Sequence, residues 1–354
     1  MNKISTYKQN EASRDAGIDL LKALAIFGVI TIHLCTYGYK NPIPSFGFLS
    51  SVFWGSITRA SVPIFFMCSG ALLLTPQKKM TLGKLFSKNL LRIVCAMFAW
   101  ALAYQAYDLL VSGTLSFAAC YQALKEVLLF NQEFHLYYLH ILILVYLFLP
   151  ITRVFVKNAT QKELKYALAV WFLFGILYPT VKPFWPFRLL SGIPVQWAMN
   201  MTYAAIGYGV LGYYLAHYPI SQKWNCLLCA AGFFSVFGLT TVLSIKTGSL
   251  YQNFLEGMSV GVALLAMGLF GLCYNLRASI KGSASAVVTK ISKASFCIYL
   301  VHVFILHLFD YFGISVNDFP CLISIPVLSC VNLALSYGIY YVLSKIPVVN
   351  RWLV

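Results

Sequence analysis

Residues 17–37 read GIDLLKALAIFGVITIHLCTY, an apolar run that holds three ionisable side chains, Asp19, Lys22 and His33. A run of about 20 apolar residues suits a helix that crosses the ~30 Å hydrocarbon core of a bilayer. Comparable runs follow along the chain, and ten predicted spans occupy residues 18–37, 48–74, 90–111, 136–155, 166–181, 201–217, 226–245, 254–274, 295–312 and 322–343. The sequence therefore predicts an all-α, polytopic integral membrane protein with about ten transmembrane helices.

The composition of the whole chain agrees with a lipid environment. Of its 354 residues, 60% are hydrophobic and 10% are charged, whereas soluble domains carry about 25% charged residues. A soluble fold of this length has too little interior to bury so much apolar surface. Because the loops between the spans are short, we expect a leader at residues 1–16, one membrane-embedded domain at 17–345 and a tail at 346–354.

The basic residues predict the orientation of the chain. The net charge of +16, from 26 Lys and Arg against 10 Asp and Glu, would also suit a nucleic-acid-binding protein, but its distribution along the chain argues against one. With a cytoplasmic N-terminus, 19 basic residues lie on the inner side and five on the outer side, while Lys22 and Arg59 fall within spans. This asymmetry follows the positive-inside rule, so both termini are predicted to be cytoplasmic and the partner surface is a lipid bilayer.

The ionisable residues of the first span are candidates for a functional site, because charges within a bilayer are costly. Asp19 and Lys22 are three residues apart and can pair, either as an ordinary ion pair at the membrane interface or within a site. His33 follows Lys22 by 11 residues, which is 20° past three full helical turns and a rise of ~16 Å. A lone histidine is often a core residue, but one on the same stripe as Lys22 suggests the wall of a polar cavity.

The second span carries Arg59 about 11 residues from its outer end, four residues before Pro63. Arg59 either extends back to the interface or binds an anion within a cavity, and its depth favours the cavity. Pro63 removes a backbone hydrogen bond. Gly70, further along the same span, permits another helix to approach closely.

Further polar residues stand at the outer edge of the fourth span and in the ninth. These are Glu133, His135, Tyr137, Tyr138 and His140 at the outer edge, and Tyr299, His302 and His307 in the ninth span. No H-x-x-x-H or H-E-x-x-H spacing accompanies them, so we expect no metal site. The chain also lacks the Walker, G-x-G-x-x-G and G-x-S-x-G motifs, which removes the usual support for ATP-driven transport and hydrolase chemistry.

Four motifs, taken together, resemble those of the membrane-bound acyltransferase family 3. In chain order they are Asp19, Lys22 and His33 in the first helix; VPIFFMCSG at 62–70; HLYYL at 135–139 with Tyr146 and Pro150; and SFCIYLVH at 295–302. Each motif alone is weak, but four in the same order on one topology are specific. The likeness covers nearly the whole chain, and within the family the chain resembles the surface-polysaccharide O-acetyltransferases, such as the enterobacterial-common-antigen type.

Two positions depart from the pattern of this family. The family often has two arginines three residues apart at the start of the third helix, where this chain has Asn89 and Arg92 with Lys88 alongside. The tryptophan of its "HLWYL" motif is Tyr137 here. Only Arg92 of the arginine pair therefore carries over.

The resemblance implies an O-acyltransferase of a bacterial plasma (inner) membrane that binds no permanent cofactor. The donor co-substrate would be cytoplasmic acyl-CoA, most simply acetyl-CoA, with its phosphates bound by Lys22, Lys88 and Arg92. The acceptor would be a hydroxyl of a cell-surface or lipid-linked glycan, bound by Glu133, His135 and Tyr138. His33 would act as general base or as a transient acyl carrier. Asp19 would assist it, with Arg59, Tyr299 or His302 stabilising the oxyanion.

Two other functions fit parts of the pattern. A proton-coupled transporter or flippase of a glycan or small molecule would also use ten spans and buried basic residues. We see no internal repeat and no acidic residue near mid-bilayer, since Asp19 lies near the inner face and Asp108 and Asp310 near the outer face. A membrane scaffold or sensor would have no need for Lys22 and His33 on one stripe.

Overall fold

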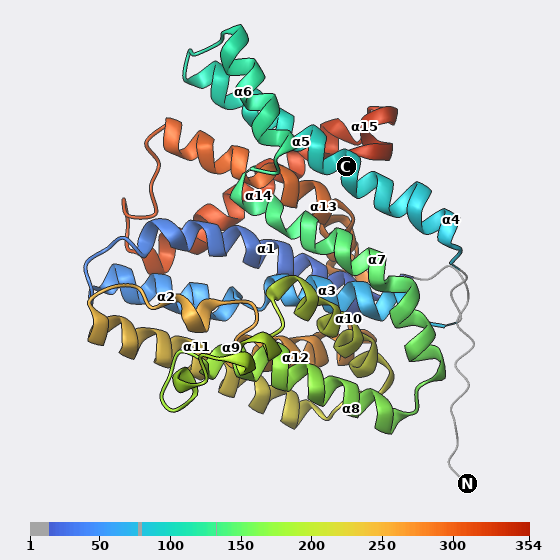
Figure 1. The fold of residues 1–354 in the computed structure, drawn as a ribbon. Helices are drawn as coiled ribbons and strands as arrows, with labels where there is room; N and C mark the ends of the chain where they lie inside the picture. Colours follow the sequence, from blue (N-terminus) through green and yellow to red (C-terminus); the bar gives the residue numbers. More distant parts are fainter. Residues whose placement is uncertain (1–13, 77–79, 132) are drawn as a thin grey trace.

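The computed structural model of the chain describes residues 14–76, 80–131 and 133–354, which form helices joined by loops without a β-strand (Figure 1). In chain order the α-helices are α1 (Ala16–Gly38), α2 (Phe46–Thr58), α3 (Ser61–Leu73), α4 (Leu82–Lys84), α5 (Leu91–Val111), α6 (Phe117–Leu128), α7 (Tyr137–Asn158), α8 (Gln161–Trp171), α9 (Tyr178–Val181), α10 (Met201–His217), α11 (Gln222–Thr247), α12 (Val260–Asn275), α13 (Gly282–Tyr311), α14 (Cys321–Leu343) and α15 (Pro347–Trp352). Two π-helical segments, η1 (Leu85–Leu90) and η3 (Phe172–Leu177), and the 3-10 turns η2 (Phe134–Leu136), η4 (Phe187–Leu189), η5 (Ile193–Trp197) and η6 (Gln252–Leu255) complete the series.

Within the described parts of the chain, nine helical segments are long and apolar enough to cross a membrane. They correspond to nine of the ten predicted spans. The tenth, 201–217, forms α10 with the predicted bounds; its 17 residues give a length of about 26 Å, somewhat less than the ~30 Å core. The prediction of an all-α, polytopic membrane protein is confirmed.

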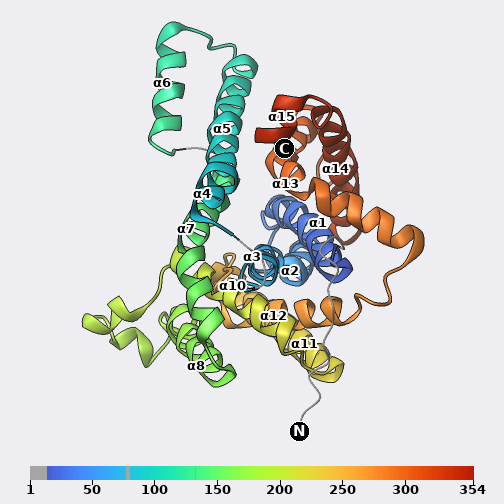
Figure 2. The same cartoon turned by 90° about the vertical axis from the view of Figure 1, so that its right-hand side faces the viewer.

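Helix α1 lies in the middle of the bundle. It contacts α2 and α3 on one side and α13 and α14 on the other (Figure 2), and α12 as well. Its side chains Leu21, Ile26 and Ile30 are fully buried. Because α1 is apolar almost all round, protein surrounds it as it would a core helix. Its ionisable side chains therefore face neighbouring helices.

The second span is interrupted at Arg59 and Ala60. Helix α2 ends at Thr58 and α3 begins at Ser61. Pro63 has no N–H to donate to the carbonyl four residues earlier, which is that of Arg59. The interruption places Arg59 in a turn between the two helices, within a segment long and apolar enough to cross a membrane.

Glycines allow α3 and α10 to pack with their backbones in contact. A Cβ atom added to Gly70 of α3 would lie 1.8 Å from the carbonyl oxygen of Gly209. A Cβ atom on Gly212 of α10 would lie 2.1 Å from the carbonyl oxygen of Met67. Both obstacles are backbone atoms, which cannot move aside as a flexible side chain can. The predicted close approach at Gly70 is confirmed.

We expect Gly70→Ala to lower the thermal stability of the protein in detergent, by about 1–3 kcal/mol of unfolding free energy, because the added methyl group overfills the α3–α10 contact. Gly238→Ala in α11 is the matched control, since nothing lies within 4 Å of a Cβ atom there. Thermal unfolding monitored by size-exclusion chromatography measures both. Equal midpoints for the two variants would contradict this packing.

The two ends of the bundle differ in the elements they hold. The first turn of α1, α4 and α15 lie at one end, here named the inner end, while α6 and the loop between α1 and α2 lie toward the other, the outer end (Figure 1). Residues 346–354, expected as a tail, contain α15, which packs against α5. The assignment of the inner end to the cytoplasm stays a prediction from the charges.

Candidate functional site

A cavity of about 740 Å³ opens between helices at the inner end. Five basic side chains line it, contributed by α1, η1, α5, α13 and α15: Lys22, Lys88, Arg92, Lys293 and Arg351. None of the described residues that line it is acidic. The inner cavity, as we name it, therefore has the electrostatic character of a site for a polyanion.

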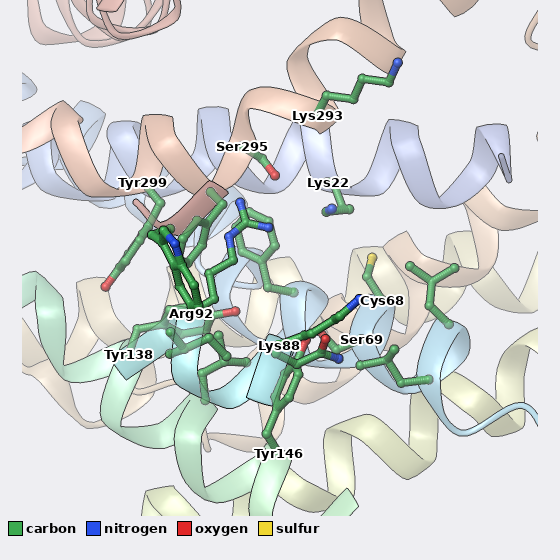
Figure 3. Close-up of a pocket in the computed structure, with 18 of the residues that line it drawn as sticks. Lys22, Cys68, Ser69, Lys88, Arg92, Tyr138, Tyr146, Lys293, Ser295 and Tyr299 are labelled. Carbon is green, nitrogen blue, oxygen red and sulfur yellow. The ribbon is translucent and has the colours of Figure 1, made fainter. Parts of the chain in front are cut away.

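The local structure explains how the cations reach this cavity. Lys88 lies in the π-helical turn η1 and Arg92 in the first turn of α5. A π-helical turn shifts side-chain directions relative to a regular α-helix and often marks a functional site. Figure 3 shows Lys22, Lys88 and Arg92 around the cavity, whereas the ammonium group of Lys293 extends away from the other labelled side chains. Lys293 thus belongs to the rim.

The deep end of the inner cavity meets a layer of aromatic and histidine rings. Tyr138 and Tyr299 line the cavity, and their ring centroids are 5.1 Å apart. The ring of Tyr299 lies 5.8 Å from that of His135, and His135 lies 5.4 Å from His302. The ring of His302 in turn lies 5.1 Å from that of His33. We name these five residues the histidine layer.

Hydrogen bonds fix some of these rings. Nδ1 of His302 lies 2.7 Å from the carbonyl oxygen of Tyr299, and the amide of Asn332 donates to the carbonyl oxygen of His302 at 3.0 Å. A neutral His302 that donates through Nδ1 keeps a free lone pair on Nε2. Within the described residues, Nε2 of His302 and both ring nitrogens of His135 are buried without a hydrogen-bond partner. A buried polar atom without a hydrogen bond lowers the stability of the fold. Such atoms are rare in folded proteins and are typical of a functional site.

The hydroxyl of Tyr299 donates to the carbonyl oxygen of His135. Its single proton is therefore already engaged in this arrangement. An oxyanion stabilised by Tyr299 would require that bond to break. His33, by contrast, is only half buried, and the ring of Phe134 lies 5.1 Å from it.

Arg59 lies close enough to His33 for the two side chains to interact electrostatically. Its Nε donates to the carbonyl oxygen of Leu255. That bond orients the guanidinium and leaves its terminal N–H groups for an anionic partner. Arg59 is not among the residues that line the inner cavity, so its binding of an anion within a cavity stays a prediction.

A second hollow of about 590 Å³ lies at the outer end. Its described lining residues are Phe130, Tyr137, His140, Ile141, Met201, Thr202 and Glu256. They come from the first turns of α7 and α10 and from the segments that precede α7 and α12. This outer groove combines aromatic faces with a carboxylate and an imidazole.

The predicted pairing of Asp19 with Lys22 is wrong. Asp19 forms an ion pair with Arg14, whose Nη2 and Nε lie 2.6 and 2.9 Å from its carboxylate oxygens. Ser292 and Thr289 of α13 also donate to Asp19, at 2.7 and 3.2 Å. Arg14 pairs with Asp19 in place of Lys22 because it lies just before the helix and forms two hydrogen bonds to the carboxylate. Lys22 faces the inner cavity instead. Asp19 therefore joins α1 to α13, the two helices that carry His33 and His302.

The binding of an acceptor by Glu133, His135 and Tyr138 stays a prediction. His135 and Tyr138 belong to the histidine layer, whereas Glu133 lies just before η2. Burial raises the pKa of the Glu133 carboxyl, and Asp108 raises it further while His307 opposes the rise. Glu133 therefore interacts electrostatically with Asp108 and His307, and the ring of the next residue, Phe134, lies 5.1 Å from that of His33.

Sequence reasoning missed several residues of these two hollows. In the sequence, Lys293 and Arg351 contributed only to the number of basic residues on the inner side. Trp352 was only part of the expected tail. Glu256 carried no motif. Within the described residues, no group of three His, Cys, Asp or Glu side chains is placed to hold a metal ion.

A sequence model of one protein family, described as an acyltransferase domain, matches residues 15–341. The match includes α1, both parts of the second span and the segments that form the histidine layer. It ends before α15. Comparison with curated proteins and with solved structures gives no match.

Proposed function

This chain belongs to acyltransferase family 3, and from that premise we propose that it is an O-acetyltransferase that modifies a glycan across a bacterial inner membrane. Its membership in the family and its apolar helices make it a multi-pass membrane acyltransferase. The choice of acetyl-CoA as donor and of a surface or lipid-linked glycan as acceptor is our proposal, as is the similarity to the enterobacterial-common-antigen enzymes.

One observation carries the proposal. The inner cavity has basic side chains near its mouth and reaches, at its deep end, the same layer of rings that holds His33. Acyl-CoA has the matching form: a phosphate-rich nucleotide at one end and a neutral thioester at the other. Lys22, Lys88 and Arg92 would bind the phosphates, and the pantetheine arm would extend toward Tyr138 and Tyr299.

The acceptor would approach from the outer groove. Its aromatic side chains offer apolar faces to a sugar ring, Glu256 would accept hydrogen bonds from hydroxyl groups, and His140 would donate or accept them. Of these residues, Glu256 is one that the sequence alone did not single out. It leaves His135 and Tyr138 to form the wall between donor and acceptor, where the two would meet near His33.

At that point His33 would remove the proton of the acceptor hydroxyl. The hydroxyl oxygen forms a bond to the thioester carbonyl carbon, and the negative charge that develops on the carbonyl oxygen is stabilised by Arg59. Collapse of this intermediate breaks the carbon–sulfur bond and yields the acetyl ester. The proton held by His33 passes to the leaving thiolate, so CoA departs as the free thiol.

Reconstituted protein and acetyl-CoA labelled in the acetyl group provide the test. We expect CoA thiol release that depends on an added glycan acceptor, with the label recovered on that glycan. A proton-coupled transporter would instead move charge or substrate across the vesicle membrane with neither thiol release nor label transfer. That second outcome would refute the proposed function.

A further inference from the structure

The short helix α15 lies outside the part of the chain that matches the family, yet it forms one wall of the inner cavity. Arg351 and Trp352, its last two residues, are among the residues that line it. Neither belongs to a motif that the family resemblance identifies. They line this cavity together with Lys22 and Arg92.

Specific bonds hold this segment in place. The indole N–H of Trp100 donates to the carbonyl oxygen of Leu353 at 3.0 Å, and the guanidinium of Arg92 donates to the carbonyl oxygen of Val354. The side chain of Val354 is 5% exposed and packs with Cys297 and Val301. Figure 2 shows α15 beside α5 and α13. The segment is therefore fixed against the bundle, with Arg351 and Trp352 at the cavity.

The side chains of α15 differ chemically from the lysines that line the same cavity. Trp352 adds a flat aromatic ring, and the guanidinium of Arg351 lies 5.2 Å from the centre of that ring. Lys22 and Lys88 can bind phosphates but cannot recognise a planar base. Aromatic side chains stack on nucleobases, and arginine adds a cation that can pair with a phosphate. A wall with both groups suits a nucleotide better than a simple polyanion.

On this basis we propose that α15 recognises the nucleotide end of the acyl-CoA donor: Trp352 stacks on the adenine and Arg351 contacts an adjacent phosphate. This inference rests on the proposed function for the identity of the donor. It assigns the discrimination between CoA and shorter thioesters to residues beyond the family match. Arg92 couples the two parts, since it lines the cavity and also bonds to the segment after α15.

The test uses adenosine 3′,5′-bisphosphate, which carries the base and phosphates without a thioester, so that binding is measured separately from acyl transfer. We expect calorimetry on the full-length protein in detergent to give binding for the wild type and at least about 10-fold weaker binding for Trp352→Ala. Trp224→Ala removes a tryptophan of α11 that is 61% exposed and outside the cavity, and it should bind like the wild type. Arg351→Ala changes an exposed side chain and should also weaken binding, even if Trp352→Ala fails to fold.

A second readout separates this inference from the proposed function. In the transfer assay, Trp352→Ala should raise the KM for acetyl-CoA while leaving that for S-acetylpantetheine, which lacks the nucleotide, unchanged. Absence of nucleotide binding by the wild type would overturn the inference, as would equal effects on both donors or an effect of Trp224→Ala as large as that of Trp352→Ala. Nucleotide binding that depends on Trp352, in a protein that transfers no acyl group, would uphold α15 as the recognition element and refute the proposed function alone.

Discussion

His33→Asn should reduce acyl transfer by at least ~10²-fold while the protein remains folded, inserted and able to bind acetyl-CoA. Asparagine has a similar size and polarity, but its amide cannot accept the proton of the acceptor hydroxyl. General-base catalysis contributes about 10²–10⁴-fold to a rate, which sets the size of the expected loss. The rings of His302 and Phe134, each 5.1 Å away, would remain around the new side chain.

The control for this variant is His217→Asn. His217 is exposed at the end of α10 and is bonded to the carbonyl oxygen of Tyr213, away from both hollows. Initial rates of glycan acetylation, normalised to folded protein, should match the wild type in the control. Near-normal rates in His33→Asn would show that His33 packs against its neighbours and is not the catalytic base. Acetylated His33, trapped without acceptor and identified by mass spectrometry, would show that it carries the acyl group and does not merely remove a proton.

Lys22→Ala should raise the KM for acetyl-CoA about 10- to 100-fold. The side chain lines the inner cavity, and within the described residues it makes no ion pair, because Asp19 is bonded to Arg14. A hydrogen bond to a charged group contributes about 1.5–3 kcal/mol, which corresponds to this range. Lys22→Arg keeps the positive charge and should retain most of the affinity.

Lys223→Ala serves as the control for Lys22, since Lys223 is exposed at the start of α11 and does not line the cavity. Titration of initial rates against acetyl-CoA concentration gives KM and kcat for all three variants. The loss in Lys22→Ala should decrease at high salt, because the interaction is electrostatic. A KM unchanged from the wild type would exclude Lys22 from donor binding.

Most of the fold was predictable because hydrophobicity decides it. A lipid solvent requires long apolar helices, and their positions follow from the sequence. Their ends are less well predicted, since α13 begins at Gly282 and not at residue 295. The break at Arg59 was less evident, since Pro63 indicated a lost hydrogen bond but not that the helix would end at Thr58. Helix α15 was missed because six residues beyond the last span have no periodicity from which to predict it.

The candidate site was predictable in its members more than in its contacts. Lys22, Lys88 and Arg92 do line one cavity, and His33 and His302 do meet, as helices far apart in sequence pack together. The Asp19–Lys22 pair failed because helical spacing makes a contact geometrically available without deciding between competitors. Arg14 competes from outside the helix, where periodicity gives no information. The positions of Arg351 in the inner cavity and of Glu256 in the outer groove depend on tertiary packing alone, which the sequence pattern does not reveal.

The sidedness of the reaction tests the central claim most directly, because the account requires the donor on the inner end and the acceptor on the outer end. Acetyl-CoA does not cross a sealed bilayer, so it can be supplied to one face at a time. We predict that inverted membrane vesicles given external acetyl-CoA release CoA outside and acetylate glycan in their lumen, whereas sealed right-side-out vesicles do so only after permeabilisation. Acetylation by sealed right-side-out vesicles, or product on the same face as the donor, would contradict the account.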